Sequence, residues 1–209
     1  MAVPALGYRL SGLRATVVLL MALLLGGCGV NNIPTYDEEV KAAWSQVLNQ
    51  YQRRADLIPN LVEVVRGYAG HERETLTAVV EARAKATQTT ATLPADILTN
   101  PEAFRLFQEN QQTLSGALSR LMLVVERYPD LKANQNFQSL QAQIEGTENR
   151  VAVARRDYIQ SVQKYNTEIR TFPGVIWATL LYRDAKPKEN FTAQAGAEQA
   201  PRVDFGRRP

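Results

Sequence analysis

Hydrophobic side chains recur at steps of three and four residues along three long stretches of the chain, which is the spacing of amphipathic helices. The first stretch runs from about residue 37 to residue 87. Pro59 lies inside it and lacks the amide that would bond the Ala55 carbonyl, so we expect a kink or a helix restart there, with Asp56 as a cap. Its apolar stripe consists of Val40, Trp44, Val47, Tyr51, Ile58, Leu61, Val65, Leu76, Val79 and Val80.

The second and third stretches follow a polar segment, residues 88–100, that is predicted to be a loop. Asn100-Pro101-Glu102 is typical of a helix start, with Asn at the cap and Pro at the first helical position. Pro129 ends the second stretch, and Pro173-Gly174 ends the third, which begins near Asn134. Their seams are Phe104, Phe107, Gln111, Leu114, Leu118, Leu121, Val125 and Tyr128, and then Phe137, Leu140, Ile144, Thr147, Val151, Ala154, Tyr158, Val162, Tyr165, Ile169 and Phe172.

These patterns predict an all-α protein in which residues 37–182 form a long antiparallel helical bundle of the four-helix type. No isolated amphipathic helix is stable alone, so the stripes must pack together. The apolar segment 175–182 is too short to span a bilayer and is expected to fold back on the bundle end. Residues 28–36 are predicted to be a tether, and residues 183–209, rich in Ala, Gln, Pro, Lys and Arg, a disordered tail.

The N-terminal residues have the organisation of a secretory signal. Arg9 and Arg14 precede an uncharged apolar run, residues 15–25, and small residues follow it. Leu25-Gly26-Gly27-Cys28 resembles a lipobox, which implies that residues 1–27 are removed and that the Cys28 thiol is acylated. The alternative is an uncleaved N-terminal membrane helix with Cys28 as an incidental thiol.

Acylation of Cys28 predicts a protein held on a membrane of the cell envelope and facing away from the cytoplasm. Gly29, and not an aspartate, follows the cysteine. In this the chain resembles lipoproteins that are sorted to the outer membrane. We therefore expect the outer membrane if the cell has one, and otherwise the plasma membrane.

Composition removes several classes of function. The chain has 24 Lys and Arg against 21 Asp and Glu, and Arg9 and Arg14 belong to the leader, so the remainder is close to neutral and predicts no nucleic-acid partner. One Cys and one His can form neither an internal disulfide nor a zinc site. The nucleotide-binding, zinc-protease and hydrolase motifs are absent from the sequence. We therefore expect no metal, no cofactor and no catalytic residues.

Several blocks of the sequence occur in the order seen in one family. The blocks are Arg54-Ala55-Asp56-Leu57-Ile58-Pro59-Asn60-Leu61-Val62, Tyr68-Ala69-Gly70-His71-Glu72, Glu126 to Asn134, Gly146 to Val151, Arg155-Arg156-Asp157-Tyr158, Tyr165-Asn166 and Phe172-Pro173-Gly174. Through them, residues 36–182 resemble the LemA family, which implies a long antiparallel helical bundle behind an N-terminal membrane segment or a lipobox. The biochemical role of that family is poorly defined, so the resemblance implies little about mechanism.

The motif residues are candidates for an interaction site. Asp56 is expected to form an ion pair with Arg53 or Arg54, or to cap a helix at Pro59. A binding role is the alternative. His71 beside Glu72 is either a capping or hinge pair or a general base. Two tyrosines one heptad apart are either core residues or an aromatic binding site. The candidates are Arg54, Asp56, Asn60, His71, Glu72, Asn149, Arg150, Arg156, Tyr158, Tyr165 and Asn166.

Three functions remain open at this point. The first is a membrane-anchored scaffold or interaction module, bound to the membrane through Cys28 or an uncleaved helix and to an unidentified envelope protein. The second is an enzyme, or the regulatory subunit of an envelope enzyme, that uses His71 and Glu72. The third is a lipid-binding protein that remodels membranes through residues 175–182.

Overall fold

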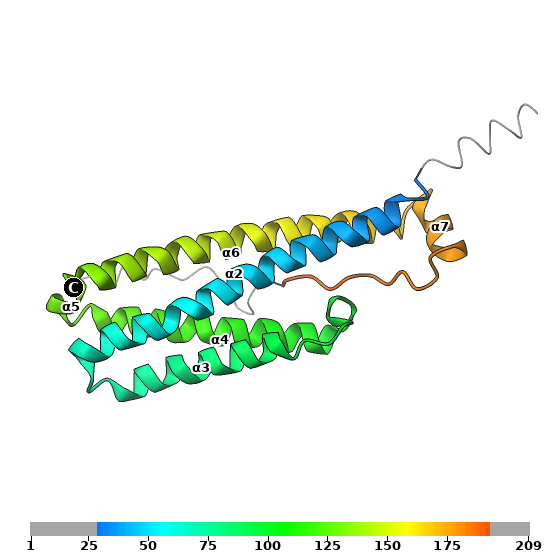
Figure 1. The fold of residues 1–209 in the computed structure, drawn as a ribbon. Coiled ribbons are helices and arrows are strands. Elements are labelled where there is room, and N and C mark those ends of the chain that lie inside the picture. Colours follow the sequence, from blue (N-terminus) through cyan, green and yellow to red (C-terminus); the bar gives the residue numbers. More distant parts are fainter. Residues whose placement is uncertain (1–28, 193–209) are drawn as a thin grey trace, which may run out of the picture.

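Residues 29–192 are described by a computed structural model, in which four long helices lie side by side (Figure 1). Within these residues the protein is all-α and contains no strand, which confirms the predicted fold class. The helices are α2 (Asn32–Ala69), α3 (Arg73–Ala91), η1 (Ile97–Thr99), α4 (Pro101–Val125), α5 (Pro129–Lys132), α6 (Gln135–Glu168) and α7 (Gly174–Leu180).

The four long helices do not close a complete ring. Helix α2 packs along α6 and against α3, and α3 packs along α4, whereas α4 and α6 scarcely approach each other. At one end α2 and α6 run past the other two helices, and α7 lies beside them (Figure 1). We call this end, residues 29–36 and 169–182, the anchor end, and the opposite end, residues 68–73 and 126–135, the far end.

Helix α2 continues through Pro59, so the predicted helix restart there is wrong, while the predicted kink stays a prediction. The Ala55 carbonyl, which Pro59 cannot bond, accepts a hydrogen bond of 2.8 Å from Nε of Arg83 on α3. Ile58 and Leu61, on either side of the proline, are fully buried and hold the helix in place. Asp56 is exposed and accepts from Gln52, so it is not a helix cap.

The predicted tether is mostly helical. Helix α2 begins at Asn32, and Ile33 is already buried in the core. Pro34 lies in the first turn, where amides have no helical partner and proline costs little. The Asn32 side chain also donates to Glu168 at the end of α6, 3.1 Å away. Only residues 29–31 therefore separate the bundle from Cys28.

Residues 183–192, which we call the strap, are ordered against the bundle, so the prediction of a disordered tail is wrong for this segment. It has no helix, but its Phe191 is buried and its backbone is hydrogen-bonded to α6. A polar composition hides these contacts because they depend on one aromatic side chain and on main-chain groups. The rest of the predicted tail, residues 193–209, lies outside the described residues.

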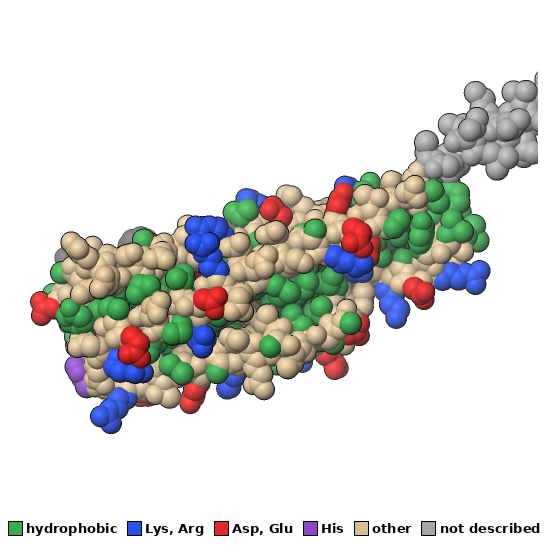
Figure 2. Space-filling view, in the orientation of Figure 1, with side chains coloured by type: hydrophobic (Ala, Val, Ile, Leu, Met, Phe, Trp, Pro, Cys, Tyr) green, Lys and Arg blue, Asp and Glu red, His purple; other side chains and the backbone are tan. Residues whose placement is uncertain are grey.

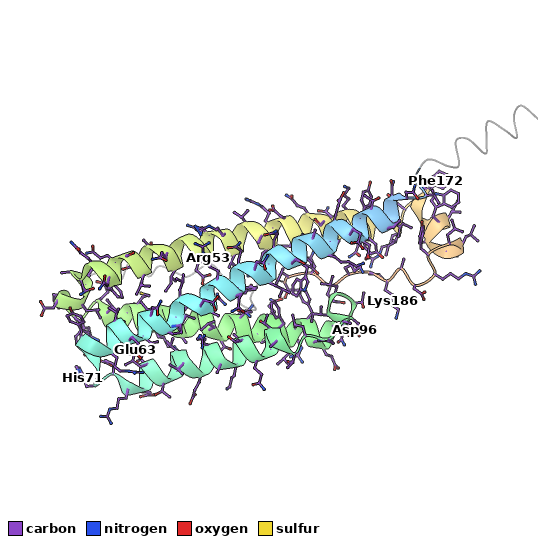
Figure 3. All side chains as sticks on the ribbon, in the orientation of Figure 1. Arg53, Glu63, His71, Asp96, Phe172 and Lys186 are labelled. Atoms are coloured by element: carbon purple, nitrogen blue, oxygen red, sulfur yellow. The ribbon has the colours of Figure 1, made fainter. Side chains whose placement is uncertain are left out.

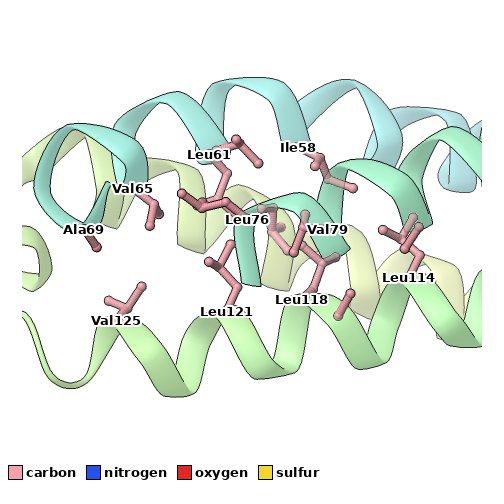
Figure 4. Packing of buried hydrophobic residues seen from close by; sticks show 14 of the residues in the cluster. Ile58, Leu61, Val65, Ala69, Leu76, Val79, Leu114, Leu118, Leu121 and Val125 are labelled. Atoms are coloured by element: carbon pink, nitrogen blue, oxygen red, sulfur yellow. The ribbon is translucent and has the colours of Figure 1, made fainter. Parts of the chain in front are cut away.

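The buried side chains form two cores. The far core is mainly aliphatic and draws on α2, α3, α4, α5 and α6 (Figure 4). The anchor core is rich in aromatic side chains and contains Trp44, Tyr51, Phe104, Phe107, Tyr158, Tyr165 and Phe191. Most of the predicted seam positions are buried, but Phe172, predicted to continue the α6 seam, is 80% exposed.

The connection between α3 and α4 is only partly a loop. Helix α3 runs to Ala91 and η1 occupies 97–99, so the predicted loop of residues 88–100 is too long. Asn100 caps α4 as predicted, with its side-chain oxygen accepting from the Ala103 amide at 3.1 Å.

Candidate functional site

Arg54 is buried between the two cores and joins three helices. It is 1% exposed. Its Nη1 donates to Ser115 Oγ at 2.8 Å and to Glu148 Oε1 at 2.9 Å. Its Nη2 donates to Gln111 Oε1 at 2.6 Å, and the guanidinium lies 5.0 Å from the centre of the Tyr51 ring.

This network corrects the predicted pairing of Arg54 with Asp56. A buried cation must be paired, because its desolvation costs several kcal/mol on an order-of-magnitude scale. The carboxylate that pairs with Arg54 is Glu148 of α6, which lies outside the predicted α6 seam and is 40% exposed. Gln111, a polar residue within the α4 seam, was the one sequence signal of a buried polar partner.

The gap between α4 and α6 contains a groove beside this network. Its volume is about 540 Å³. Leu118, Met122 and Ile144 give it an apolar lining, while serines, a glutamine, glutamates and an asparagine supply polar groups. The lining residues are Ser115, Leu118, Ser119, Met122, Gln141, Ile144, Glu145, Glu148 and Asn149.

Toward the anchor end, the strap occupies the corresponding position between α4 and α6. Phe191 packs against Phe104 of α4 and Tyr158 of α6, with ring centres 5.1 and 5.5 Å apart. Gln108 of α4 donates to the Thr192 carbonyl at 3.1 Å, and the Arg155 guanidinium lies 4.3 Å from the Phe191 ring centre. An extended peptide thus bridges two helices whose backbones stay apart and which touch here through the stacked rings of Phe104 and Tyr158.

Three of the family-motif candidates hold this strap. The Tyr158 hydroxyl donates to the Glu189 carbonyl at 2.7 Å. Asn166 bonds both main-chain groups of Lys188, at 2.9 and 2.8 Å. Tyr165 lies under the Lys188 ammonium, 5.1 Å from its ring centre. Both tyrosines are buried in the anchor core, as the first of the two predicted alternatives requires.

Lys188 also ties the strap to the start of α2. Its Nζ lies 2.6 Å from Asp37 Oδ1, and Lys41 lies 2.8 Å from the other carboxylate oxygen. Partial burial alone would raise the pKa of Asp37, but the hydrogen bonds from Lys188 and Lys41 outweigh it and lower that pKa below its usual value.

His71 and Glu72 take part in a clamp at the far end. The Tyr128 hydroxyl is hydrogen-bonded to His71 Nε2 and donates to Glu72 Oε1 at 2.9 Å. Arg127 lies 3.0 Å from the same carboxylate. These contacts join the α2–α3 turn to the α4–α5 turn, as a hinge or capping pair would.

The remaining candidates do not converge on one site. Asn60 and Arg156 are exposed on different helices. Asn149 is exposed and lines the α4–α6 groove, whereas Arg150 faces a shallower hollow near Gln46. Cys28 lies outside the described residues.

Two features are absent from residues 29–192. No group of three or more His, Cys, Asp and Glu side chains in this range is arranged to bind a metal ion. No helix in the same range combines the length and apolar character needed to span a bilayer.

Known proteins resemble this chain over most of its length. The model of the LemA family matches residues 43–205. Magnetosome protein MamQ 2 of Paramagnetospirillum magneticum is 25% identical over 76% of this chain and 62% of its own. Protein LemA of Metamycoplasma hominis is 24% identical over 68% of this chain and 60% of its own. The chain therefore spans less than two thirds of the length of these relatives.

Proposed function

The chain belongs to the LemA family, and on that premise we propose that it is a non-catalytic scaffold of the cell envelope, anchored through acylated Cys28. Its α4–α6 groove binds an extended segment of another envelope protein. The observation that carries this proposal is the incomplete ring of helices, which leaves a lined groove where a closed bundle would have a packed interface.

The strap indicates what kind of occupant the groove accepts. Residues 183–192 enter the same α4–α6 gap as an extended chain, insert one aromatic ring and bond through main-chain groups. The groove continues this surface with apolar residues between polar edges. An extended peptide with an apolar side chain matches both features, and main-chain contacts would supply affinity with little demand on its sequence.

The connection to the membrane is short and stiff in this proposal. Residues 29–31 join Cys28 to a helix that is packed from Asn32 onward. A lipid on Cys28 would therefore hold the bundle itself, rather than a loosely tethered domain, close to the bilayer.

A catalytic role for His71 and Glu72 has less support. Both side chains are engaged with Tyr128, and the contacts connect two turns. We propose that His71 is structural. His71→Ala would then lower the melting temperature, whereas an enzyme would lose turnover without losing stability.

The anchor is tested by expressing full-length wild type and Cys28→Ala with a labelled fatty acid and separating membranes by flotation. We expect label and membrane association in the wild type and loss of both in the variant. A variant that stayed membrane-bound with its leader attached would overturn the lipid anchor in favour of an uncleaved helix.

The groove is tested by Ser119→Trp, which fills it from α4. Leu123→Trp is the matched control, because Leu123 is on the same helix and 72% exposed. Full-length proteins are photo-cross-linked in native membranes through a photoreactive residue at Met122. A peptide adduct from another protein that Ser119→Trp abolishes and Leu123→Trp retains supports the proposal. An adduct to the chain's own residues beyond Thr192 contradicts it.

A further inference from the structure

Exposed apolar side chains gather at the anchor end on and around α7. Phe172 is 80% exposed, Leu180 58% and Leu181 60%. Ile176 and Val175 add 41% and 37% exposure on the same short helix. We call residues 172–181 the apolar cap. In the space-filling view it forms a hydrophobic patch at the end of the bundle, and the side-chain view places Phe172 there (Figures 2 and 3).

The cap adjoins the point where the chain enters from its leader. Asn32 bonds Glu168 at the end of α6, directly before the segment that carries the cap. Cys28 precedes Asn32 by four residues, and the apolar run 15–25 ends three residues before Cys28. At about 3.5 Å per extended residue, Cys28 lies within roughly 14 Å of Asn32.

Basic side chains surround the cap. Arg170, Arg183 and Lys186 are exposed around it, and Asp184 is the one acidic residue between positions 170 and 186. An apolar surface edged by cations fits the interface of a bilayer that contains anionic lipid, because apolar side chains enter the acyl boundary while cations meet headgroups.

We propose that the apolar cap inserts into the interface of an anionic lipid bilayer and fixes the orientation of the bundle on it. The inference rests on the proposed membrane anchoring and adds a second contact that does not involve Cys28. With the cap in lipid, the bundle projects from the surface. The groove residues on α6 precede Ile169 by 20–28 positions, which places them roughly 30–40 Å along the helix from the membrane.

The two tryptophans of the chain allow a direct test in the full-length protein. Trp44→Phe leaves Trp177, which lies within α7 and is half-buried. Trp177→Phe leaves Trp44, which is 6% exposed in the anchor core and serves as the matched control. Each protein is reconstituted into vesicles of brominated phosphatidylcholine, with and without phosphatidylglycerol, and its flotation and emission are recorded.

We expect both proteins to float, with Trp177 emission quenched and Trp44 emission retained. Quenching should be stronger with phosphatidylglycerol, and equal quenching without it would remove the anionic requirement. Flotation without quenching of Trp177 would overturn the cap's contact with lipid and leave the anchor standing. Failure to float would overturn the anchor and the cap contact together.

Substitutions separate the cap from other exposed apolar residues. Ile176→Asp with Leu180→Asp, in the Trp44→Phe protein, should abolish quenching without affecting flotation through Cys28. Leu106→Asp with Leu123→Asp is the matched control, because these residues are 52% and 72% exposed on α4. If Trp177 emission instead shifted with protein concentration in the absence of lipid, the cap would be an interface between two copies, and the proposal would be wrong.

Discussion

The two halves of the bundle solve the same packing problem in different ways. In the far half, α2, α3, α4 and α6 bury aliphatic side chains at regular helical positions. In the anchor half, α3 contributes no buried residue, and large aromatic rings together with the strap and η1 complete the core. Because the anchor core has no buried residue from α3, bulky aromatic rings and a non-helical segment fill the place of that helix.

The two halves also carry different proposed contacts. The far half is a conventional helical core that holds the four helices together, and the groove opens on its α4–α6 side. The anchor half holds the strap and the apolar cap, and the described chain begins at this end with residue 29. Arg54 lies between the two, so its removal should affect both halves at once.

Arg54→Ala is expected to have the largest effect on stability. It leaves Gln111 and Ser115 without their donor, whereas Glu148 is 40% exposed and can be solvated. The unsatisfied polar groups and the cavity left by a fully buried side chain cost about 3–5 kcal/mol. Urea unfolding measures the loss. Arg54→Met, which keeps the volume and removes the charge, should cost less. A loss below about 1 kcal/mol for Arg54→Ala would show that the network does not join the halves.

Leu121→Ala tests the far core. Leu121 is fully buried, and truncating such a leucine costs about 2–5 kcal/mol through lost burial and the cavity left behind. The midpoint of thermal unfolding should fall for the whole bundle. Leu123→Ala, two residues along the same helix and 72% exposed, is the control, and equal effects of the two substitutions would show that the α4 seam is wrongly placed.

Phe191→Ala tests the anchor half and should have a smaller global effect. Phe191 belongs to the strap, so its loss should release residues 183–192 while the helices remain folded. Limited proteolysis should cut the strap faster, with little change in helical circular dichroism. Cooperative unfolding of the whole bundle in this variant would mean that the strap is part of the main core.

Lowering the pH should have the smallest effect on stability, and the loss should be confined to the start of α2 and the strap. Because the pKa of Asp37 in the folded protein lies below its usual value of 3.8, its contribution to stability is present above pH 3.8 and is lost as pH falls through the lowered pKa. The hydrogen-exchange protection factors of residues 32–41 and 183–192, which correct for the slower intrinsic exchange in acid, should therefore fall as the pH is lowered. Asp37→Asn should remove this pH dependence, and an unchanged acid response in that variant would assign it to other carboxylates.

The packing of the far half could be predicted from the sequence, because its buried residues recur at helical spacing. The α4 and α6 seams and the Asn100 cap follow directly from residue type and order. The helix restart predicted at Pro59 does not occur. The Ala55 carbonyl, which Pro59 cannot bond, accepts a hydrogen bond from Arg83 on a different helix, and the sequence of α2 alone does not show that partner. The anchor half depends on main-chain contacts of the strap to Tyr158 and Asn166, and such contacts leave no periodic signal in the sequence.

The candidate site was only partly accessible to the same approach. Arg54 was identified, but its partner Glu148 is 94 residues away and looked solvent-facing on its own helix. The groove could not be predicted at all, because it arises from α4 and α6 remaining apart. That separation depends on how four helices and the strap pack together, not on any one stretch of sequence.

The central claim is that the bundle meets lipid at its anchor end and a protein segment in its groove. The most direct measurement is photo-cross-linking of the full-length protein in native membranes, with the photoreactive residue at Ile176 in one sample and at Met122 in the other. We predict lipid adducts from Ile176 and peptide adducts of another protein from Met122. Lipid adducts from Met122 and none from Ile176 would contradict the account, because the bundle would then lie with its groove against the membrane.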